Sequence, residues 1–202
     1  HTRPIPRKTT SNPSRPASRN PDHRQLAQML LAWFRTHARH LPWRKTRDPY
    51  AIWISEVMLQ QTRVQTVIPY WERWMKTLPD VRSLARAESD QVLMLWEGLG
   101  YYSRAQNLQR AAADILRRFH GRIPSDLTHL LSLPGVGPYT AGAICSIAFN
   151  LPTPAVDGNV LRVLARAFGI AGSPRIPPTR TRLESYALAL IQSAAATPTR
   201  SG

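Results

Sequence analysis

The sequence predicts an all-α fold. Apolar residues recur at helical spacing in several segments, and no run of alternating β-branched residues lies between turn signals. Residues that favour helix starts, such as Asp48 and Asp157, precede several of these segments. With 202 residues, of which 43% are hydrophobic, the chain is long enough for one sizeable domain or two small ones.

Two expected helices lie in the first third of the chain. The first begins after Pro21, and its apolar residues fall on one helix face at Leu26, Met29, Leu30, Trp33 and Phe34. The second is expected from Tyr50 to Thr62, because Asp48 is a favourable N-cap and a proline follows it. Before both helices, residues 1–21 are rich in Pro, Ser, Thr and Arg, which predicts a disordered basic tail.

The remaining helices follow in order. Ser103 is expected to cap a helix that runs to Phe119, with Gly121 just past its end, and residues 125–133 form a short amphipathic helix. Three more segments complete the set, namely Pro138 to about Phe149, a helix capped by Asp157 that runs to about Phe168, and residues 180–195.

The charge of the chain points to a polyanionic partner. The formal net charge is +15, and residues 25–202 alone keep 21 basic and 11 acidic residues. Such a balance favours nucleic acid or an acidic membrane surface as the partner. No segment approaches the apolar length of a membrane span or of a signal-peptide core, so we expect a cytoplasmic protein. The Arg- and Ser-rich start also resembles a transit peptide, which leaves an organelle as the alternative.

The chain has one cysteine, Cys145. An internal disulfide and a cysteine-based metal site are therefore both excluded for these residues. Because Cys145 lies in an apolar run, a buried inert thiol is the favoured interpretation.

The segment LSLPGVGPYTAGAI places a Gly-x-Gly turn before a proline that suits a helix start. Gly135 and Gly137 let a large ligand approach the backbone, and the helix after Pro138 begins with unpaired N–H groups. These features predict a clamp for one phosphate of a nucleic-acid backbone. An ordinary turn between two helices accounts for the same residues equally well.

Three side chains are candidates for chemistry. Glu56 lies among apolar residues, where burial raises the pKa of a carboxyl and suits a general acid, although spacing alone favours a solvent-exposed glutamate. Asp157 is first of all an N-cap, and the N–H groups that bind it favour its ionised form. An acid paired with an anion suits cleavage of a glycosidic bond. Tyr139, directly after the turn, either packs or orients a carboxylate.

Five motifs, LPWRK, ISEVMLQQTR, WEGLGYYSRAQNL, LPGVGPYTAGAI and VDGNVLRVLAR, together closely resemble the adenine DNA glycosylase family, MutY. The resemblance runs from about residue 24 to about residue 190. It implies a helix-hairpin-helix fold with a six-helix domain over residues 49–155, which includes the hairpin at about 125–149. A second helical domain, incomplete here, is implied for residues 22–48 and 156–202.

The resemblance also implies an activity. The family removes adenine mispaired with 8-oxoguanine or guanine from double-stranded DNA, and flips the base out of the duplex to do so. By motif, Glu56 would protonate the adenine, Asp157 would stabilise or trap the sugar cation, and Tyr139 and Asn159 would support these acids. Endonuclease III relatives carry lysine at the position of Tyr139, so the resemblance implies a monofunctional glycosylase. We also expect the protein to be a monomer.

Binding roles are carried over by the same motifs. Four residues would line the adenine pocket, namely Arg39, Leu41, Trp43 and Arg44. Gln61 and Tyr101 would act as wedges beside the 8-oxoguanine, with Thr62 nearby. Gly135, Val136 and Gly137 would grip phosphate.

The sequence departs from the family in two main respects, the absence of its cluster cysteines and of the C-terminal domain that helps to recognise 8-oxoguanine. The family usually holds a 4Fe–4S cluster on four cysteines that follow the segment seen here, and this chain contains none of them. The chain therefore resembles a truncated member, and two alternatives to an active adenine glycosylase stay open. One is a non-catalytic DNA-binding remnant, and the other is a different mismatch glycosylase of the same superfamily.

Overall fold

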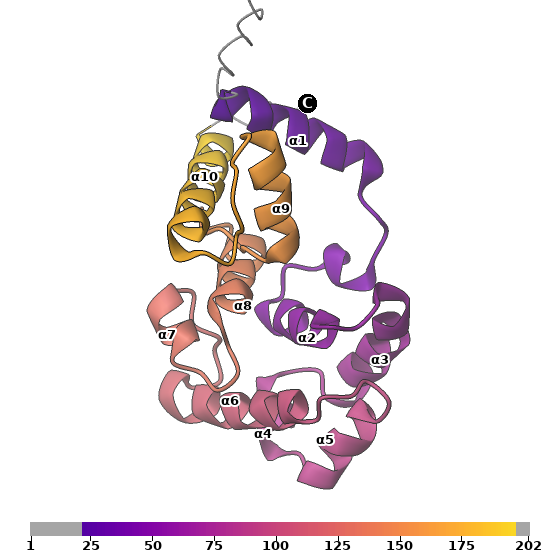
Figure 1. The fold of residues 1–202 in the computed structure, drawn as a ribbon. Helices are drawn as coiled ribbons and strands as arrows, with labels where there is room; N and C mark the ends of the chain where they lie inside the picture. The colour runs from indigo at the N-terminus through magenta and orange to yellow at the C-terminus, as the bar shows by residue number, and fades with distance from the viewer. Residues whose placement is uncertain (1–21, 197–202) are drawn as a thin grey trace, which may run out of the picture.

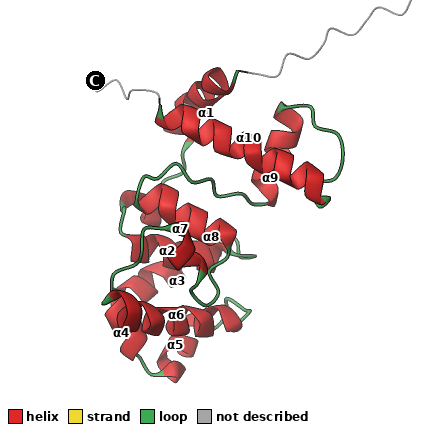
Figure 2. Ribbon diagram, turned by 90° about the vertical axis from the view of Figure 1, so that its left-hand side faces the viewer, coloured by secondary structure: helices red, strands yellow, loops and turns green. Residues whose placement is uncertain are grey.

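The computed structural model describes residues 22–196, so the predicted basic tail over residues 1–21 lies outside the described residues. Within that range the secondary structure is helical and contains no strand, which confirms the all-α prediction (Figure 2). None of the helices in residues 22–196 is long and apolar enough to cross a membrane.

The helices follow one another with short connections (Figure 1). They are α1 (His23–His37), the 3-10 helix η1 (Pro42–Lys45), α2 (Pro49–Leu59), α3 (Val64–Thr77), α4 (Val81–Arg86), α5 (Ser89–Trp96), α6 (Ser103–Phe119), α7 (Leu127–Leu131), α8 (Pro138–Ala143), the π-helical turn η2 (Ile144–Ala148), α9 (Gly158–Ala167) and α10 (Pro177–Ala195).

The buried apolar side chains form two separate clusters. The larger cluster joins η1 and helices α2 to α8, and the smaller joins α1, α9 and α10. Figures 1 and 2 agree on this arrangement, since α1, α9 and α10 gather at one end of the molecule in both views. The two ends of the described range thus meet in the smaller cluster. The domain boundaries implied by the resemblance stay a prediction.

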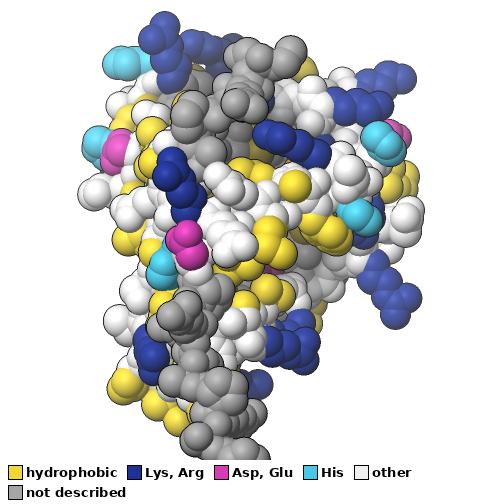
Figure 3. All heavy atoms as spheres, turned by 90° about the horizontal axis from the view of Figure 1, so that it is seen from above, with side chains coloured by type: hydrophobic (Ala, Val, Ile, Leu, Met, Phe, Trp, Pro, Cys, Tyr) yellow, Lys and Arg dark blue, Asp and Glu magenta, His cyan; other side chains and the backbone are white. Residues whose placement is uncertain are grey.

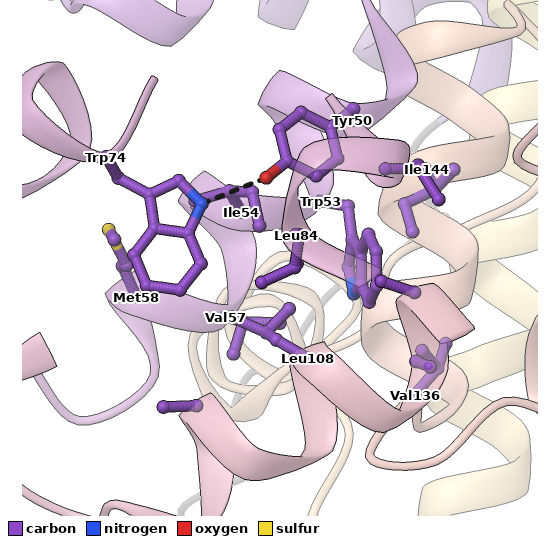
Figure 4. Close-up of a cluster of buried hydrophobic side chains, with 14 of the residues drawn as sticks. Tyr50, Trp53, Ile54, Val57, Met58, Trp74, Leu84, Leu108, Val136 and Ile144 are labelled. Carbon is purple, nitrogen blue, oxygen red and sulfur yellow. Dashed lines mark hydrogen bonds between the residues drawn. The ribbon is translucent and has the colours of Figure 1, made fainter. Parts of the chain in front are cut away.

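Helix α2 runs through the middle of the larger cluster. Every residue from Tyr50 to Met58 is buried, which follows from its almost continuous apolar sequence. The hydroxyl of Tyr50 donates there to the carbonyl oxygen of Leu78 at 2.8 Å. It also accepts from the indole of Trp74 at 3.1 Å, the hydrogen bond drawn in Figure 4. Because α2 is buried in the core, its polar side chains Ser55 and Glu56 are only 1% and 8% exposed and are held by close packing.

Helix α1 differs from the expectation of a single buried face. Ala27 is its buried residue among those described, whereas Trp33 is 58% exposed and Met29, Leu30 and Phe34 are exposed as well. The physical reason is that α1 packs mainly against α10 and shares a hydrophobic cluster with α9, so its apolar stripe extends past the helices that cover it.

Several helix ends also differ from their expected positions. The helix expected over residues 125–133 is α7, which spans Leu127–Leu131, and the helix that starts at Pro138 is α-helical to Ala143 and continues as the π-helical turn η2. Helix α2 ends at Leu59 rather than Thr62, because Gln61 adopts the left-handed backbone conformation, with φ of 57°. Ser103 is the first residue of α6, and Tyr102 occupies the cap. Helix α10 starts at Pro177, three residues before the expected start, since a proline fits the first turn.

Candidate active site

Glu56 is the buried acid of the structure. It lies on α2 and is only 8% exposed, so the expectation from spacing alone, a solvent-exposed glutamate, was wrong. Burial raises the pKa of Glu56, and the negative charge of Asp157 raises it further. A hydrogen bond from Tyr139 and the positive charge of Arg44 oppose the shift but do not cancel it. A carboxyl group of this kind is available as a proton donor.

Tyr139 is positioned by the turn that precedes it. Pro138 occupies the first position of α8, so the side chain of Tyr139 leaves the first turn of that helix. Burial and the neighbouring Glu56 carboxylate raise the pKa of Tyr139 above its usual range, and Asp157 adds to this. The phenol therefore stays protonated and acts as a hydrogen-bond donor to Glu56.

Asp157 is the N-cap of α9, as predicted. Its carboxylate accepts from the backbone N–H groups of Asn159 at 2.9 Å and Val160 at 2.8 Å. The side-chain amide of Asn159 donates to the second carboxylate oxygen at 2.8 Å, and Arg162 donates to the oxygen of that amide. The three hydrogen bonds that Asp157 accepts fix the orientation of its carboxylate. Asp157 thus caps a helix and raises the pKa of Glu56 at the same time.

Gly142 explains how the segment before Asp157 reaches this position, and sequence reasoning missed it. A Cβ atom on Gly142 would lie 2.4 Å from the carbonyl oxygen of Pro154. Helix α8 therefore touches the backbone of the connection that leads to α9, a contact that only glycine permits. The clue in the sequence was a glycine inside an apolar helical run, which indicates a close backbone approach.

Of the four residues predicted to line a base pocket, two are exposed and two are buried. Leu41 and Trp43 flank the start of η1 and pack in the larger hydrophobic cluster, where Trp43 meets Trp71 edge to face. Arg39 and Arg44 are exposed, and Arg44 donates to the carbonyl oxygen of Arg39 at 3.1 Å. Arg44 is also near enough to Glu56 to lower its pKa, which places η1 beside the acid.

The Gly-x-Gly turn joins α7 to α8 as predicted. Gly135 has φ of 73°, and a Cβ atom there would lie 2.6 Å from Cβ of Asn107, so only glycine fits. Val136 is buried in the larger cluster, and its N–H already donates to the carbonyl oxygen of Leu133 at 3.2 Å, so this residue anchors the turn from inside. Gly137 is exposed and opens onto a cleft of about 850 Å³, which Tyr139 also lines.

Gly137→Ala is a direct test of this turn as a phosphate clamp. Gly137 has φ of −90°, and a Cβ atom added to it would meet no other atom within 4 Å, so alanine leaves the fold unchanged. The added methyl group stands where a phosphate would approach the backbone N–H, so we expect binding to duplex DNA to weaken by about 2- to 10-fold, the worth of one hydrogen bond, whatever the base sequence. Affinities for several duplexes, measured by fluorescence anisotropy, check this. A loss confined to one sequence would contradict the clamp.

The residues predicted to act as wedges lie in two turns. Gln61 and Thr62 follow α2, and Tyr101 lies between α5 and α6, where its side chain is 65% exposed. Gln61 and Tyr101 both have positive φ, at 57° and 48°. The buried guanidinium of Arg104 lies between the two turns and donates to both. Sequence reasoning named the motif that contains Arg104 but did not predict the backbone contacts that it makes.

Residues 54–187 match the family model described as "HhH-GPD superfamily base excision DNA repair protein". The chain belongs to the HhH-GPD superfamily. The matched range contains Glu56, Tyr139 and Asp157, and it begins within α2 and ends within α10. The predicted resemblance to helix-hairpin-helix glycosylases is thereby confirmed at the level of the superfamily.

Relatives of this HhH-GPD protein include several named adenine DNA glycosylase. The rat protein is 49% identical over 154 residues, which are 72% of this chain and 30% of the relative. The human protein is 45% identical over 82% of this chain and 32% of the relative. The protein of Buchnera aphidicola subsp. Acyrthosiphon pisum is 43% identical over 73% of this chain and 42% of the relative. The chain thus spans less than half the length of these relatives.

Solved structures show the same fold. A thermostable thymine-DNA glycosylase superposes with a TM-score of 0.72 at 24% identity, covering 89% of both chains. Endonuclease III in a trapped covalent intermediate with DNA superposes with a TM-score of 0.65 at 22% identity, covering 86% of this chain and 84% of that chain.

The residues of this HhH-GPD chain do not fit a 4Fe–4S cluster. Such a cluster takes four cysteine thiolates, and the chain has only Cys145. Cys145 is buried, as predicted, and its thiol donates to the carbonyl oxygen of Ser125 at 3.4 Å. In residues 22–196, no group of three or more His, Cys, Asp or Glu side chains is arranged to hold a metal ion.

Proposed function

We propose that the chain is a monofunctional DNA glycosylase that hydrolyses the N-glycosidic bond of adenine mispaired with 8-oxoguanine or guanine. The observation that carries the proposal is the buried Glu56, which shares its surroundings with the Tyr139 hydroxyl and the Asp157 carboxylate. A buried acid with a raised pKa beside an oriented anion suits a reaction in which a base leaves a sugar. The names of the similar proteins support adenine as that base.

The reaction starts with proton transfer from Glu56 to a ring nitrogen of the flipped adenine. The bond between the sugar carbon C1′ and the adenine nitrogen then breaks, and its electron pair leaves with the protonated base. The Asp157 carboxylate stabilises the positive charge that forms on the sugar, or bonds to C1′ before water replaces it. Addition of water to C1′ and loss of a proton leave an abasic site. Tyr139 carries no amine, so no Schiff base with the sugar forms at that position.

Recognition of the mispair is assigned to two groups of residues. Arg39, Leu41, Trp43 and Arg44 surround the flipped adenine. Gln61 and Tyr101 enter the base stack next to the opposite base, with Thr62 beside them. Inserted side chains of this kind compensate for part of the energy needed to unstack a base, which amounts to a few kcal/mol.

Double-stranded DNA is the proposed partner, bound by a monomer at the nucleoid. The formal net charge of +15 favours a polyanion. Figure 3 looks onto the end formed by α1, α9 and α10 and shows more Lys and Arg than Asp and Glu side chains there. The exposed Gly137 and the first turn of α8 supply N–H groups for one backbone phosphate.

Single-turnover release of adenine across a pH series tests the function. We expect release from a duplex with one adenine opposite 8-oxoguanine. The rate is highest below the raised pKa of Glu56 and falls by about tenfold per pH unit above it, because only the protonated carboxyl donates. A duplex with thymine opposite guanine is the control. Release of thymine but not adenine would show that the chain is a different mismatch glycosylase. Binding without release would show that it is a non-catalytic DNA-binding protein.

A further inference from the structure

Two exposed side chains depend on an unfavourable backbone conformation. Gln61 and Tyr101 have φ of 57° and 48°, in the left-handed region that residues with a Cβ atom disfavour. Such conformations persist only where the surrounding structure imposes them, and they cluster at functional sites. Gln61 lies just after α2 and Tyr101 lies five residues after α5, so two separate turns carry the same strain.

Arg104 connects these two turns. Its Nη1 donates to the carbonyl oxygens of Val57 at 2.9 Å and Gln60 at 2.6 Å, at the end of α2. Its Nη2 donates to those of Leu99 and Gly100, each at 3.0 Å, directly before Tyr101. One guanidinium therefore binds the residue before Gln61 and the residue before Tyr101 at once.

The position of Arg104 suits a fixed clamp. The residue is only 9% exposed, and its guanidinium carbon lies 5.0 Å from the ring centre of Trp96 and 5.6 Å from that of Tyr101. The carbonyl groups at the end of α2 lie at the negative pole of the helix, which favours a cation. Backbone N–H of Arg104 also donates to the carbonyl oxygen of Tyr101 at 2.9 Å, which ties α6 to the same turn.

We propose that Arg104 is a positioning residue that holds Gln61 and Tyr101 in the left-handed conformation, so that both side chains project together into the duplex. The inference rests on the proposed function, which assigns these two residues to the mispair. Arginine is required because its planar fork presents donors in two directions. Lysine keeps the charge but offers three donors at one point, and so reaches only one turn.

The test compares Arg104→Lys with Arg110→Lys, the same change at an exposed position of α6. The probe is a duplex in which a 2′-fluoro adenosine, resistant to cleavage, lies opposite 8-oxoguanine. We expect Arg104→Lys to lower the preference for this duplex over a fully paired one by roughly 10- to 100-fold, as for loss of a stacked side chain. Affinity for the paired duplex stays unchanged, and Arg110→Lys keeps the full preference. An equal preference in both variants would overturn the proposal.

A double-mutant cycle separates positioning from a general structural role. In a chain that carries Gln61→Ala and Tyr101→Ala, the wedge side chains are already gone. Adding Arg104→Lys to it should therefore change the mispair preference little. A further loss as large as that in the wild-type background would show that Arg104 acts through something other than these residues.

Two measurements without DNA test directly whether Arg104 holds the two turns. In a crystal structure of Arg104→Lys, we expect φ of at least one of Gln61 and Tyr101 to leave the left-handed region, and unchanged values would overturn the proposal. Native-state hydrogen exchange on the wild-type chain needs no variant to fold. The turns at residues 60–62 and 99–102 should open together, and separate opening would contradict a shared clamp. If wild type shows no mispair preference while both results hold, the proposed function fails and the clamp stands.

Discussion

Glu56→Gln is expected to abolish base release while duplex binding stays nearly unchanged. General acid catalysis contributes about 100- to 10,000-fold to a rate, so single-turnover release should fall by at least that lower figure. Glutamine has the shape of glutamic acid but no acidic proton, and the Tyr139 hydroxyl donates to its amide oxygen as it does to the carboxyl of Glu56. The buried position thus keeps a partner, and the fold is preserved.

The measurement pairs single-turnover release with duplex affinity in the same buffer. Loss of rate with unchanged affinity indicates an interaction made in the chemical step. Glu72→Gln, the same substitution at an exposed position of α3, is the matched control and should behave as wild type. If Glu56→Gln weakens binding and release equally, or lowers the unfolding temperature strongly, Glu56 has a structural role instead.

Asp157→Asn is expected to give the second large loss. Asparagine caps a helix as well as aspartate does, so its side-chain oxygen still accepts from the N–H groups of Asn159 and Val160. The negative charge that faces the sugar cation is lost, however. Removal of one such stabilising group costs about 100- to 1,000-fold in rate.

The pH profile gives Asp157→Asn a second readout. The charge of Asp157 raises the pKa of Glu56, so its removal should shift the fall in release to lower pH. Asp48→Asn, the same change at the N-cap of α2, is the control for capping and should leave both rate and profile unchanged. An Asp157→Asn chain that keeps the wild-type rate would exclude a role for this carboxylate in the reaction.

Local signals predicted the starts of several helices well. Asp48 and Asp157 were expected to cap α2 and α9, and each accepts backbone N–H bonds from the first turn of its helix. Gly121 was placed just past the end of α6, where His120 and Gly121 have positive φ. These predictions succeeded because a cap or turn depends on atoms within about four residues of it.

Local sequence signals did not predict that the candidate acid, Glu56, is buried. Spacing alone favoured an exposed Glu56, because burial of a charged group is rare and its cost depends on what surrounds it. Its surroundings come from Tyr139 and Asp157, which follow it by 80 residues or more in the chain. The motifs indicated which residues take part, and the fold decided that the acid is buried and that the anion lies near it.

The contacts that bring the site together were apparent only from the tertiary structure. Composition and motif order were enough to predict a basic all-α protein with a Gly-x-Gly turn and two candidate acids, since these are properties of short segments. The contact of Gly142 with Pro154 and the five carbonyl groups that Arg104 binds join segments far apart in sequence. Such contacts form because packing in the core brings their backbones together, and packing is a property of the whole chain.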